Sequence, residues 1–211
     1  MESCEITKLF SIYALAALLI LFTVISYMTM CSGASPDPPA EPEMEFIMTS
    51  CGLTLYPDLC IQSLSPYAST VVHMSPRRLA QVALAVSLSH ARSTSDMVVS
   101  LSKENDMSPR EAAAVADCIM TIGTSIDELQ QSFGEMKNLG GPDFDLKLSN
   151  IQTWVSAALT NEDTCMDGFE GDAMNGNIKN TIRSGIVIVA QLTSNALALS
   201  TKLSSTQAKE P

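Results

Sequence analysis

The sequence predicts an all-α fold, an up-down-up-down four-helix bundle with an N-terminal helical hairpin and two disulfides. Three observations point to it: long segments whose apolar residues recur at steps of three and four, an aromatic content of only 5%, and short polar turns between these segments. The four long helices are expected at about 75–103, 109–136, 144–159 and 174–204. Short connections between long amphipathic helices favour antiparallel neighbours, which gives the up-down order.

The segment from Pro109 to Met136 carries the clearest pattern. Its apolar residues keep alternating steps of three and four, as expected for the buried seam of a bundle helix. Ser108 and Glu111 have the spacing of a capping box, with Pro109 at the first helical position. A second set of residues shares the opposite face and is free to meet solvent or a partner; it comprises Asp117, Met120, Thr124, Asp127 and Gln131.

The other long helices are expected on the same grounds. The first begins at Ser75-Pro76, the third begins at Phe144, and the fourth keeps its apolar steps from Ile178 to Leu203. The glycines at 140 and 141 end the second helix and turn the chain. After the third helix we expect a polar turn, in which Glu162 and Asp163 are solvated; the apolar face of the third helix nevertheless continues to Cys165.

The N-terminal 43 residues are expected to lie outside the folded domain. Residues 9–30 carry no charge, and Ser32-Gly33-Ala34 offers small residues to a signal peptidase, so residues 1–34 are interpreted as a secretory signal peptide. An uncleaved signal anchor is the alternative, and no stable membrane association is expected once the leader is removed. Residues 35–43 form a Pro-rich spacer. The domain then spans 44–205, with the hairpin at 44–72, the bundle at 75–205 and a polar tail at 206–211.

Four cysteines remain after the leader, and they allow three pairings. The sequential pairing joins Cys51 to Cys60, which closes the hairpin, and Cys118 to Cys165, which ties the second bundle helix to the third. The second bridge would close a loop of about 48 residues and contribute about 4 kcal/mol. A zinc site is the alternative, but the chain has no C-x-x-C motif and secretion favours disulfides.

Composition and motifs argue against several function classes. A net charge of −11 without a Lys/Arg cluster argues against nucleic-acid binding. The chain has no G-x-S-x-G or H-E-x-x-H motif and no Cys of the mature domain left as a nucleophile. Its two histidines, His73 and His90, are too few for a metal centre without partners. We therefore expect a binding protein and not an enzyme, with no cofactor and no metal.

Several motifs resemble one family. The run Cys51-Gly-Leu-Thr-Leu-Tyr-Pro-Asp-Leu-Cys60 is similar to the N-terminal hairpin of the plant invertase and pectin methylesterase inhibitors. Asp117-Cys118 and Asp127-Glu128-Leu129 resemble the second bundle helix of that family. The runs 153–160 and 164–169 resemble its third helix, and Ser194-Asn195-Ala196 resembles its fourth. The resemblance spans about 45–205. It implies the same bundle, the same two disulfides and an extracellular protein of the plant cell wall, secreted to the apoplast.

The resemblance also implies a target. In the methylesterase branch of the family the inhibitor covers the enzyme's substrate cleft in a one-to-one complex, mostly through bundle helices two to four. Thr153-Trp154-x-Ser156-Ala157-Ala158 is typical of that branch, whereas invertase inhibitors tend to carry Pro-Lys-Phe where this chain has Pro142-Asp143-Phe144. Pectin methylesterase is therefore the expected partner. The alternatives are an invertase inhibitor, a bundle that has lost inhibition, and a pro-region of a fused esterase, although the given sequence ends at Pro211 without a catalytic domain.

The residues expected to bind the target lie on two helices. On the second helix they are Met120, Thr124 and Asp127; the first two stand where the family often has acids, and only Asp127 keeps its charge. At the end of the third helix Thr164 and Asp167 match interface positions of the family. An alternative role for this last pair is to form the turn and the cap around Cys165.

Overall fold

A computed structural model describes residues 41–71, 75–103, 107–171, 174 and 176–207. The chain divides into two units, and every described residue belongs to the second, Pro39–Pro211. The expected signal peptide, most of the Pro-rich spacer, His73 and residues 208–211 lie outside the described residues.

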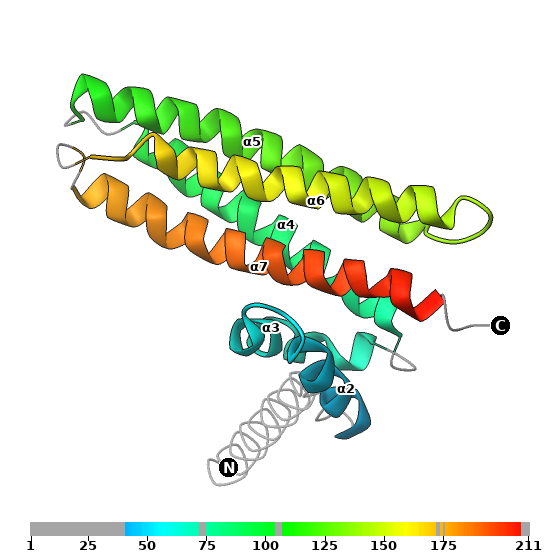
Figure 1. The fold of residues 1–211 in the computed structure, drawn as a ribbon. Helices are drawn as coiled ribbons and strands as arrows, with labels where there is room; N and C mark the ends of the chain where they lie inside the picture. Colours follow the sequence, from blue (N-terminus) through cyan, green and yellow to red (C-terminus); the bar gives the residue numbers. More distant parts are fainter. Residues whose placement is uncertain (1–40, 72–74, 104–106, 172–173, 175, 208–211) are drawn as a thin grey trace, which may run out of the picture. The chain divides into compact units, whose positions relative to one another are not determined.

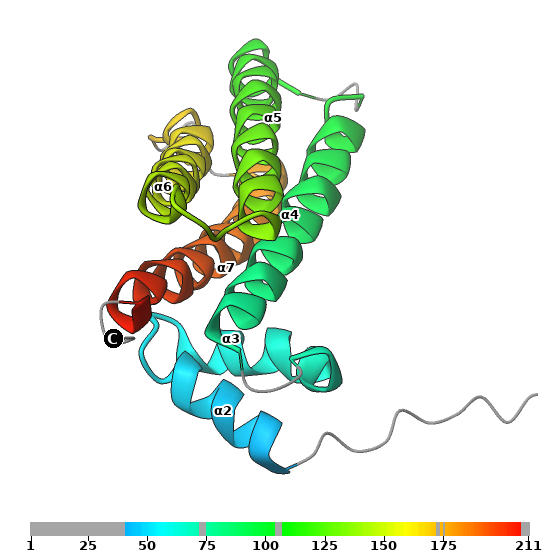
Figure 2. The same ribbon diagram turned by 90° about the vertical axis from the view of Figure 1, so that its right-hand side faces the viewer.

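Four long helices alternate in direction (Figure 1): α4 (Pro76–Leu101), α5 (Pro109–Lys137), α6 (Phe144–Asp167) and α7 (Asn177–Gln207). Each packs against the next, and α7 closes the ring by packing against α4. The hairpin consists of α2 (Glu41–Cys51), α3 (Pro57–Leu64) and the 3-10 helix η1 (Ser65–Thr70). It lies at the end of the bundle where α4 begins and α7 ends (Figures 1 and 2). The all-α bundle with its hairpin is confirmed.

The expected cap of α5 is present. The Ser108 backbone N–H donates to Glu111 Oε2 over 2.9 Å, and the Glu111 N–H donates back to Ser108 Oγ over 3.3 Å. The Ser108 backbone N–H, followed by the Ser108 hydroxyl, which donates to Glu111 Oε2 over 2.8 Å, holds the pKa of Glu111 below its ordinary value of 4.5. At the other end of the helix, Gly140 (φ 148°) and Gly141 (φ 73°) adopt the left-handed conformations that turn the chain into α6.

The third bundle helix is longer than predicted. We expected it to end near Leu159, but α6 continues to Asp167. The prediction was wrong because the polar run after Leu159 has a sequence typical of a turn, whereas tertiary contacts keep it helical. The buried face of α6 continues beyond Ala158 to Glu162 and Cys165, which are both buried.

Glu162 itself was expected to be solvated, and this prediction was also wrong. Its side chain is fully buried, and Oε1 accepts hydrogen bonds from Ser125 Oγ on α5 (2.7 Å) and Thr193 Oγ1 on α7 (3.1 Å). The Thr193 hydroxyl is in turn 2.7 Å from Ser87 Oγ on α4. One polar side chain from each bundle helix therefore meets in a buried network, which we call the four-helix network.

Burial raises the pKa of Glu162 from its ordinary value of 4.5 to about 7. The hydrogen bonds from Ser125 and Thr193 act in the opposite direction, and the charge of Asp163 adds a smaller upward effect. On α5 and α6 this network separates two apolar clusters, since Ser125 lies between Ile122 and Leu129.

Helices α4 and α7 approach each other closely at one point. A Cβ atom on Gly185 of α7 would lie 2.8 Å from Thr94 Cγ2 on α4 and 2.9 Å from Met97 Cε. Gly185 occupies one of the regularly spaced positions of α7 that are otherwise apolar. Because it has no side chain, the two helices can pack closely at this point. Helix α7 is long and apolar enough to cross a membrane by composition, but much of its apolar window is buried inside the bundle.

Both predicted disulfides are formed. Cys51 and Cys60 join α2 to α3, with Cα atoms 5.6 Å apart, and Cys118 and Cys165 join α5 to α6, with Cα atoms 4.2 Å apart. All four residues are buried. The sequential pairing is therefore confirmed, and the cysteines serve as cross-links between helices.

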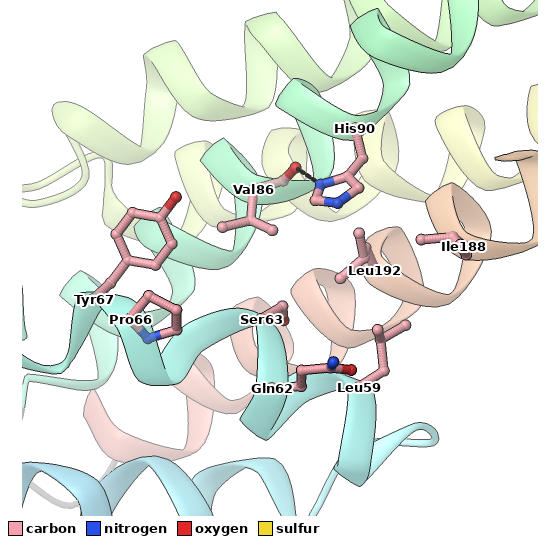
Figure 3. Close-up of a pocket in the computed structure, with 9 residues that line it drawn as sticks. All are labelled: Leu59, Gln62, Ser63, Pro66, Tyr67, Val86, His90, Ile188 and Leu192. Atoms are coloured by element: carbon pink, nitrogen blue, oxygen red, sulfur yellow. Dashed lines mark hydrogen bonds between the residues drawn. The ribbon is translucent and has the colours of Figure 1, made fainter.

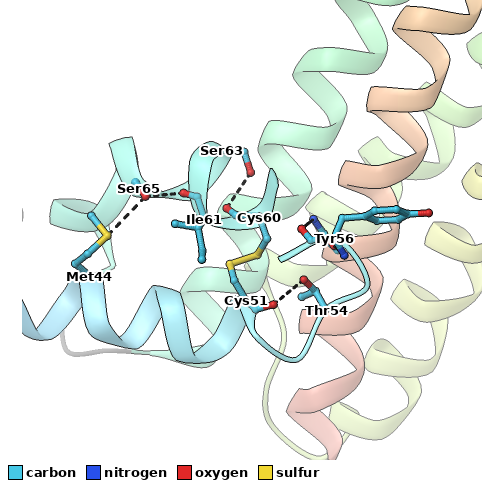
Figure 4. Close-up of a disulfide and its surroundings, with 9 residues drawn as sticks. Met44, Cys51, Thr54, Tyr56, Cys60, Ile61, Ser63 and Ser65 are labelled. Atoms are coloured by element: carbon cyan, nitrogen blue, oxygen red, sulfur yellow. Dashed lines mark hydrogen bonds between the residues drawn. A yellow bond between two sulfur atoms is a disulfide. The ribbon is translucent and has the colours of Figure 1, made fainter. Parts of the chain in front are cut away.

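A buried amide of α7 joins the turn of the hairpin to the bundle, beside the apolar packing that the two share. Asn195 on α7 donates from Nδ2 to the Tyr56 carbonyl over 2.9 Å, and its Oδ1 accepts from the Tyr56 N–H over 3.2 Å. Tyr56 lies in the turn between the two bridged helices of the hairpin, beside α7 (Figure 4). The side chain of Asn195 thus gives the Tyr56 N–H its partner and adds a second donor to the Tyr56 carbonyl, which also accepts the Cys60 N–H of α3 over 3.0 Å.

Loss of the bundle bridge should lower stability strongly. A Cys118→Ala/Cys165→Ala variant removes the constraint on a 47-residue separation, and we expect a loss of about 4 kcal/mol, or about 8–16 °C in Tm. The matched Cys51→Ala/Cys60→Ala variant opens a much shorter loop and should lose about 3 kcal/mol. Thermal unfolding followed by circular dichroism measures both. An unchanged midpoint in the first variant would contradict the assigned role.

Removal of the Asn195 amide should weaken the attachment of the hairpin turn to α7. An Asn195→Ala variant leaves the Tyr56 N–H without a partner and leaves the Tyr56 carbonyl with only the Cys60 N–H, at a cost of about 2 kcal/mol. Hydrogen exchange of the Tyr56 amide should become much faster, while exchange in the middle of α5 stays slow. The control is Asn180→Ala, an exposed position on the same helix that should leave both rates unchanged. Unchanged Tyr56 protection in the first variant would refute the attachment.

Candidate target-binding surface

The outer face of α5 presents the three residues expected there. Met120, Thr124 and Asp127 are all exposed, Met120 to 67%. The Thr124 hydroxyl donates to the Met120 carbonyl over 3.1 Å, which ties the oxygen to the helix. An exposed methionine in the middle of a helix contributes nothing to the core, so the α5 face is apolar at its centre and acidic at Asp127.

The end of α6 presents the other two expected residues. Thr164 is exposed and its hydroxyl donates to the Thr160 carbonyl over 2.7 Å, so it lies within the helix and not in a turn. Asp167 is the last residue of α6 and is also exposed. An acid at a helix C-terminus is electrostatically unfavourable, so helix stability does not account for it.

The Cys118–Cys165 bridge brings these two sets of residues together. Ser125 and Cys165 both make contacts between α5 and α6. Thr124 comes directly before Ser125, and Thr164 comes directly before Cys165. A step of one residue turns about 100° around a helix, which places both threonines at the outer edge of that seam. Met120, Asp127 and Asp167 lie farther out on the same two helices. With about 1.5 Å of rise per residue, the five positions extend over roughly 15 Å along the bundle.

A row of hydroxyl groups on α6 was not anticipated from the sequence. Thr153, Ser156 and Thr160 are exposed, and each donates to the carbonyl four residues earlier, over 2.9, 2.7 and 3.2 Å. With Thr164 they form a continuous edge of small, internally bonded side chains. The signal was present in the sequence as Ser/Thr residues at steps of three and four.

One further acid lies next to this surface. Glu128 is half-buried beside Asp127, and burial followed by the neighbouring charge of Asp127 raises the pKa of its carboxyl above the ordinary value of 4.5. We refer to the exposed flank formed by Met120, Thr124, Asp127, the hydroxyl row of α6 and Asp167 as the α5–α6 flank. It is acidic at both ends and uncharged at its centre.

A pocket of about 390 Å³ lies where the hairpin meets the bundle (Figure 3). His90 is exposed and lies at the edge of the pocket, with Nδ1 3.0 Å from the Val86 carbonyl. The pocket contains neither a carboxylate nor a cysteine beside the histidine; its lining residues are Leu59, Gln62, Ser63, Pro66, Tyr67, Val86, His90, Ile188 and Leu192. The Ser63 hydroxyl donates to the Cys60 carbonyl over 3.1 Å and is not bonded to His90, so among these residues no serine–histidine pair is formed, and one imidazole is the only strong metal ligand.

Within the described part of the chain, no three His, Cys, Asp or Glu residues are arranged to hold a metal ion. The fold and the exposed flank instead define a class of protein: a disulfide-clamped helical bundle that presents a rigid surface.

Comparisons with known proteins identify the family. The family model described as plant invertase/pectin methylesterase inhibitor matches residues 45–199. Pectinesterase inhibitor 9 of Arabidopsis thaliana is 44% identical over 185 residues, covering 85% of this chain and 91% of that protein. The 21 kDa protein of Daucus carota is 48% identical over 163 residues, covering 76% and 84%.

A solved structure shows the same fold. The crystal structure of a mutant form of a pectin methylesterase inhibitor from Arabidopsis aligns with a TM-score of 0.55 at 23% identity, covering 75% of this chain and 95% of that chain. The chain belongs to the plant invertase/pectin methylesterase inhibitor family. It is accordingly not an enzyme.

Proposed function

We propose that this protein inhibits pectin methylesterase by docking its α5–α6 flank over the enzyme's substrate cleft in a one-to-one complex. The observation that carries the proposal is the family membership, together with a relative named Pectinesterase inhibitor 9 that is similar over most of both chains. The inhibitor performs no reaction and acts by denying the polymeric substrate access to the cleft.

The physical character of the flank supports this role. It is built on two helices that a disulfide holds together, so little conformational entropy is lost when a partner binds. Met120 is exposed at a position where the family often has an acid, and the hydroxyl groups and acids of the same flank suit the polar rim of an interface. The hydroxyls of α6 are already bonded to their own helix, so burying them against a partner leaves no hydroxyl donor unsatisfied.

The features that distinguish the two branches of the family favour the methylesterase as the target. The loop before α6 carries Asp143, exposed, where the resemblance led us to expect a lysine in an invertase inhibitor. Phe144 begins α6 and packs partly against the core, whereas Asp143 faces solvent.

We further propose that the protein is secreted and acts in the apoplast. Two buried disulfides suit an oxidising compartment, and the expected signal peptide would direct the chain there. N-terminal sequencing of secreted protein tests this, with a new N-terminus near Ala34 as the expected result. Retention of Met1 on membrane-associated protein would contradict it.

One assay tests the choice of target. The purified disulfide-bonded protein is added in increasing amounts to a pectin methylesterase and, separately, to a cell-wall invertase. Loss of methylesterase activity that saturates at one equivalent is expected, with invertase unaffected. Full inhibition of invertase with none of the methylesterase would overturn the proposal.

Restoring acids on α5 tests the docking surface. A Met120→Glu/Thr124→Asp variant should bind the methylesterase more tightly if those positions meet basic groups of the enzyme. A gain of about 1 kcal/mol, or roughly fivefold in Kd, is the expected size for charges at an interface rim. Calorimetric titration measures it.

The matched control adds the same charges on another helix. Ser89 and Ser93 are exposed on α4 and also four residues apart, so Ser89→Glu/Ser93→Asp changes net charge equally without touching the α5–α6 flank. Its affinity should stay at the wild-type value. Equal effects of the two variants, or no effect of the α5 variant, would exclude this docking surface.

A further inference from the structure

The middle of the bundle contains a carboxyl group that the proposed inhibitory surface does not use. Glu162 is fully buried, and it is bonded directly or through one hydroxyl to every other helix of the bundle. Glu162 Oε2 is also buried and has no hydrogen-bond partner among the described side chains. We propose that Glu162 is a proton-controlled clamp: its protonated carboxyl holds the four helices at their present spacing, and loss of that proton loosens the middle of the bundle.

The direction of the hydrogen bonds supports this assignment. Thr193 has one hydroxyl proton and donates it to Glu162 Oε1, so Ser87 must donate to Thr193. Ser125 donates its proton to the same Oε1. Both available donors are therefore directed at one oxygen of the carboxyl, and a proton on Glu162 belongs on Oε2. Ionisation leaves this second oxygen charged, buried and without a donor, which is the costly arrangement.

The surroundings provide no compensating positive charge. Within four residues of Ser87, Ser125, Glu162 and Thr193 there is no lysine or arginine on any of the four helices. The nearby ionisable groups on α4 and α5 are the exposed His90, the exposed Asp127 and the half-buried Glu128. On α6 the adjacent Asp163 is exposed, and α7 carries no ionisable residue between Arg183 and Lys202. The nearby acids oppose ionisation of Glu162, and the site contains no buried ion pair.

The sign of the pH effect follows from the raised pKa. In the folded protein Glu162 titrates at about 7, whereas in the unfolded chain the ordinary value of 4.5 applies. Between these values the folded state holds a proton that the unfolded state has lost, so stability falls as pH rises. The contribution is fully present below about pH 4.5 and is lost by about pH 7. Glu162 therefore stabilises the bundle most in an acidic medium.

Thermal unfolding of the disulfide-intact protein between pH 4 and 8.5 tests the clamp. The wild-type protein should be compared with Glu162→Gln, which keeps the size and Oε1 of the side chain but cannot ionise. Between pH 4.5 and 7 we expect the wild-type protein to lose stability relative to this variant as pH rises. Above pH 7 the difference between the two should stay constant. Asp163→Asn, at the exposed neighbouring position, should retain the wild-type pH dependence. A constant difference between wild type and Glu162→Gln across the whole range would overturn the proposal.

A second measurement does not depend on the folding of Glu162→Gln. The infrared C=O stretch of a protonated carboxyl should persist in the folded wild-type protein well above pH 5 and disappear near pH 7. In Ser125→Ala, which removes one donor to the carboxyl, this band should persist to a higher pH. Because a hydrogen bond to the charged form lowers the pKa, its removal shifts the titration upward. Loss of all protonated carboxyl signal by pH 5.5, or an unshifted titration in Ser125→Ala, would refute the clamp.

Discussion

The pairing of α5 with α6 is the constraint on which the rest of the structure depends. The Cys118–Cys165 bridge fixes how far one helix is shifted along the other, and the hydrogen bond from Ser125 to Glu162 adds a second fixed contact, two turns away on α5 and about one turn away on α6. With this register set, apolar positions of both helices face the same core and the outer residues share one flank. The bridge therefore serves two functions, since it stabilises the bundle and gives the exposed flank a fixed shape before any partner arrives.

The sequence specified the architecture well because bundle helices carry a strong periodic signal. The steps of three and four on α5, the capping box at Ser108 and the paired glycines at 140 and 141 each correspond to an observed feature. The spacing of the cysteines was compatible with three pairings, and only the helix packing selects between them. The outward position of Met120 and Thr124 also followed from helical phase, whereas their contact with a target stays a prediction.

What the sequence could not reveal were polar groups whose role is set by other helices. Glu162 stands in a run of polar residues typical of a turn, and nothing local indicates that hydroxyls from two distant helices will meet it. Asn195 is similar, because its partner is the backbone of Tyr56, 139 residues earlier. Such residues break the apolar pattern without ending the helix, so local reasoning assigns them to the surface or to a loop.

The attachment of the hairpin has a consequence for how this protein can diversify. Asn195 forms hydrogen bonds only with main-chain atoms of Tyr56, so these bonds do not depend on which side chains the adjoining turn carries. Leu53 and Leu55 in that turn are 60% and 70% exposed. The exposed side chains of this turn can therefore vary without loss of the hydrogen bonds that join it to α7.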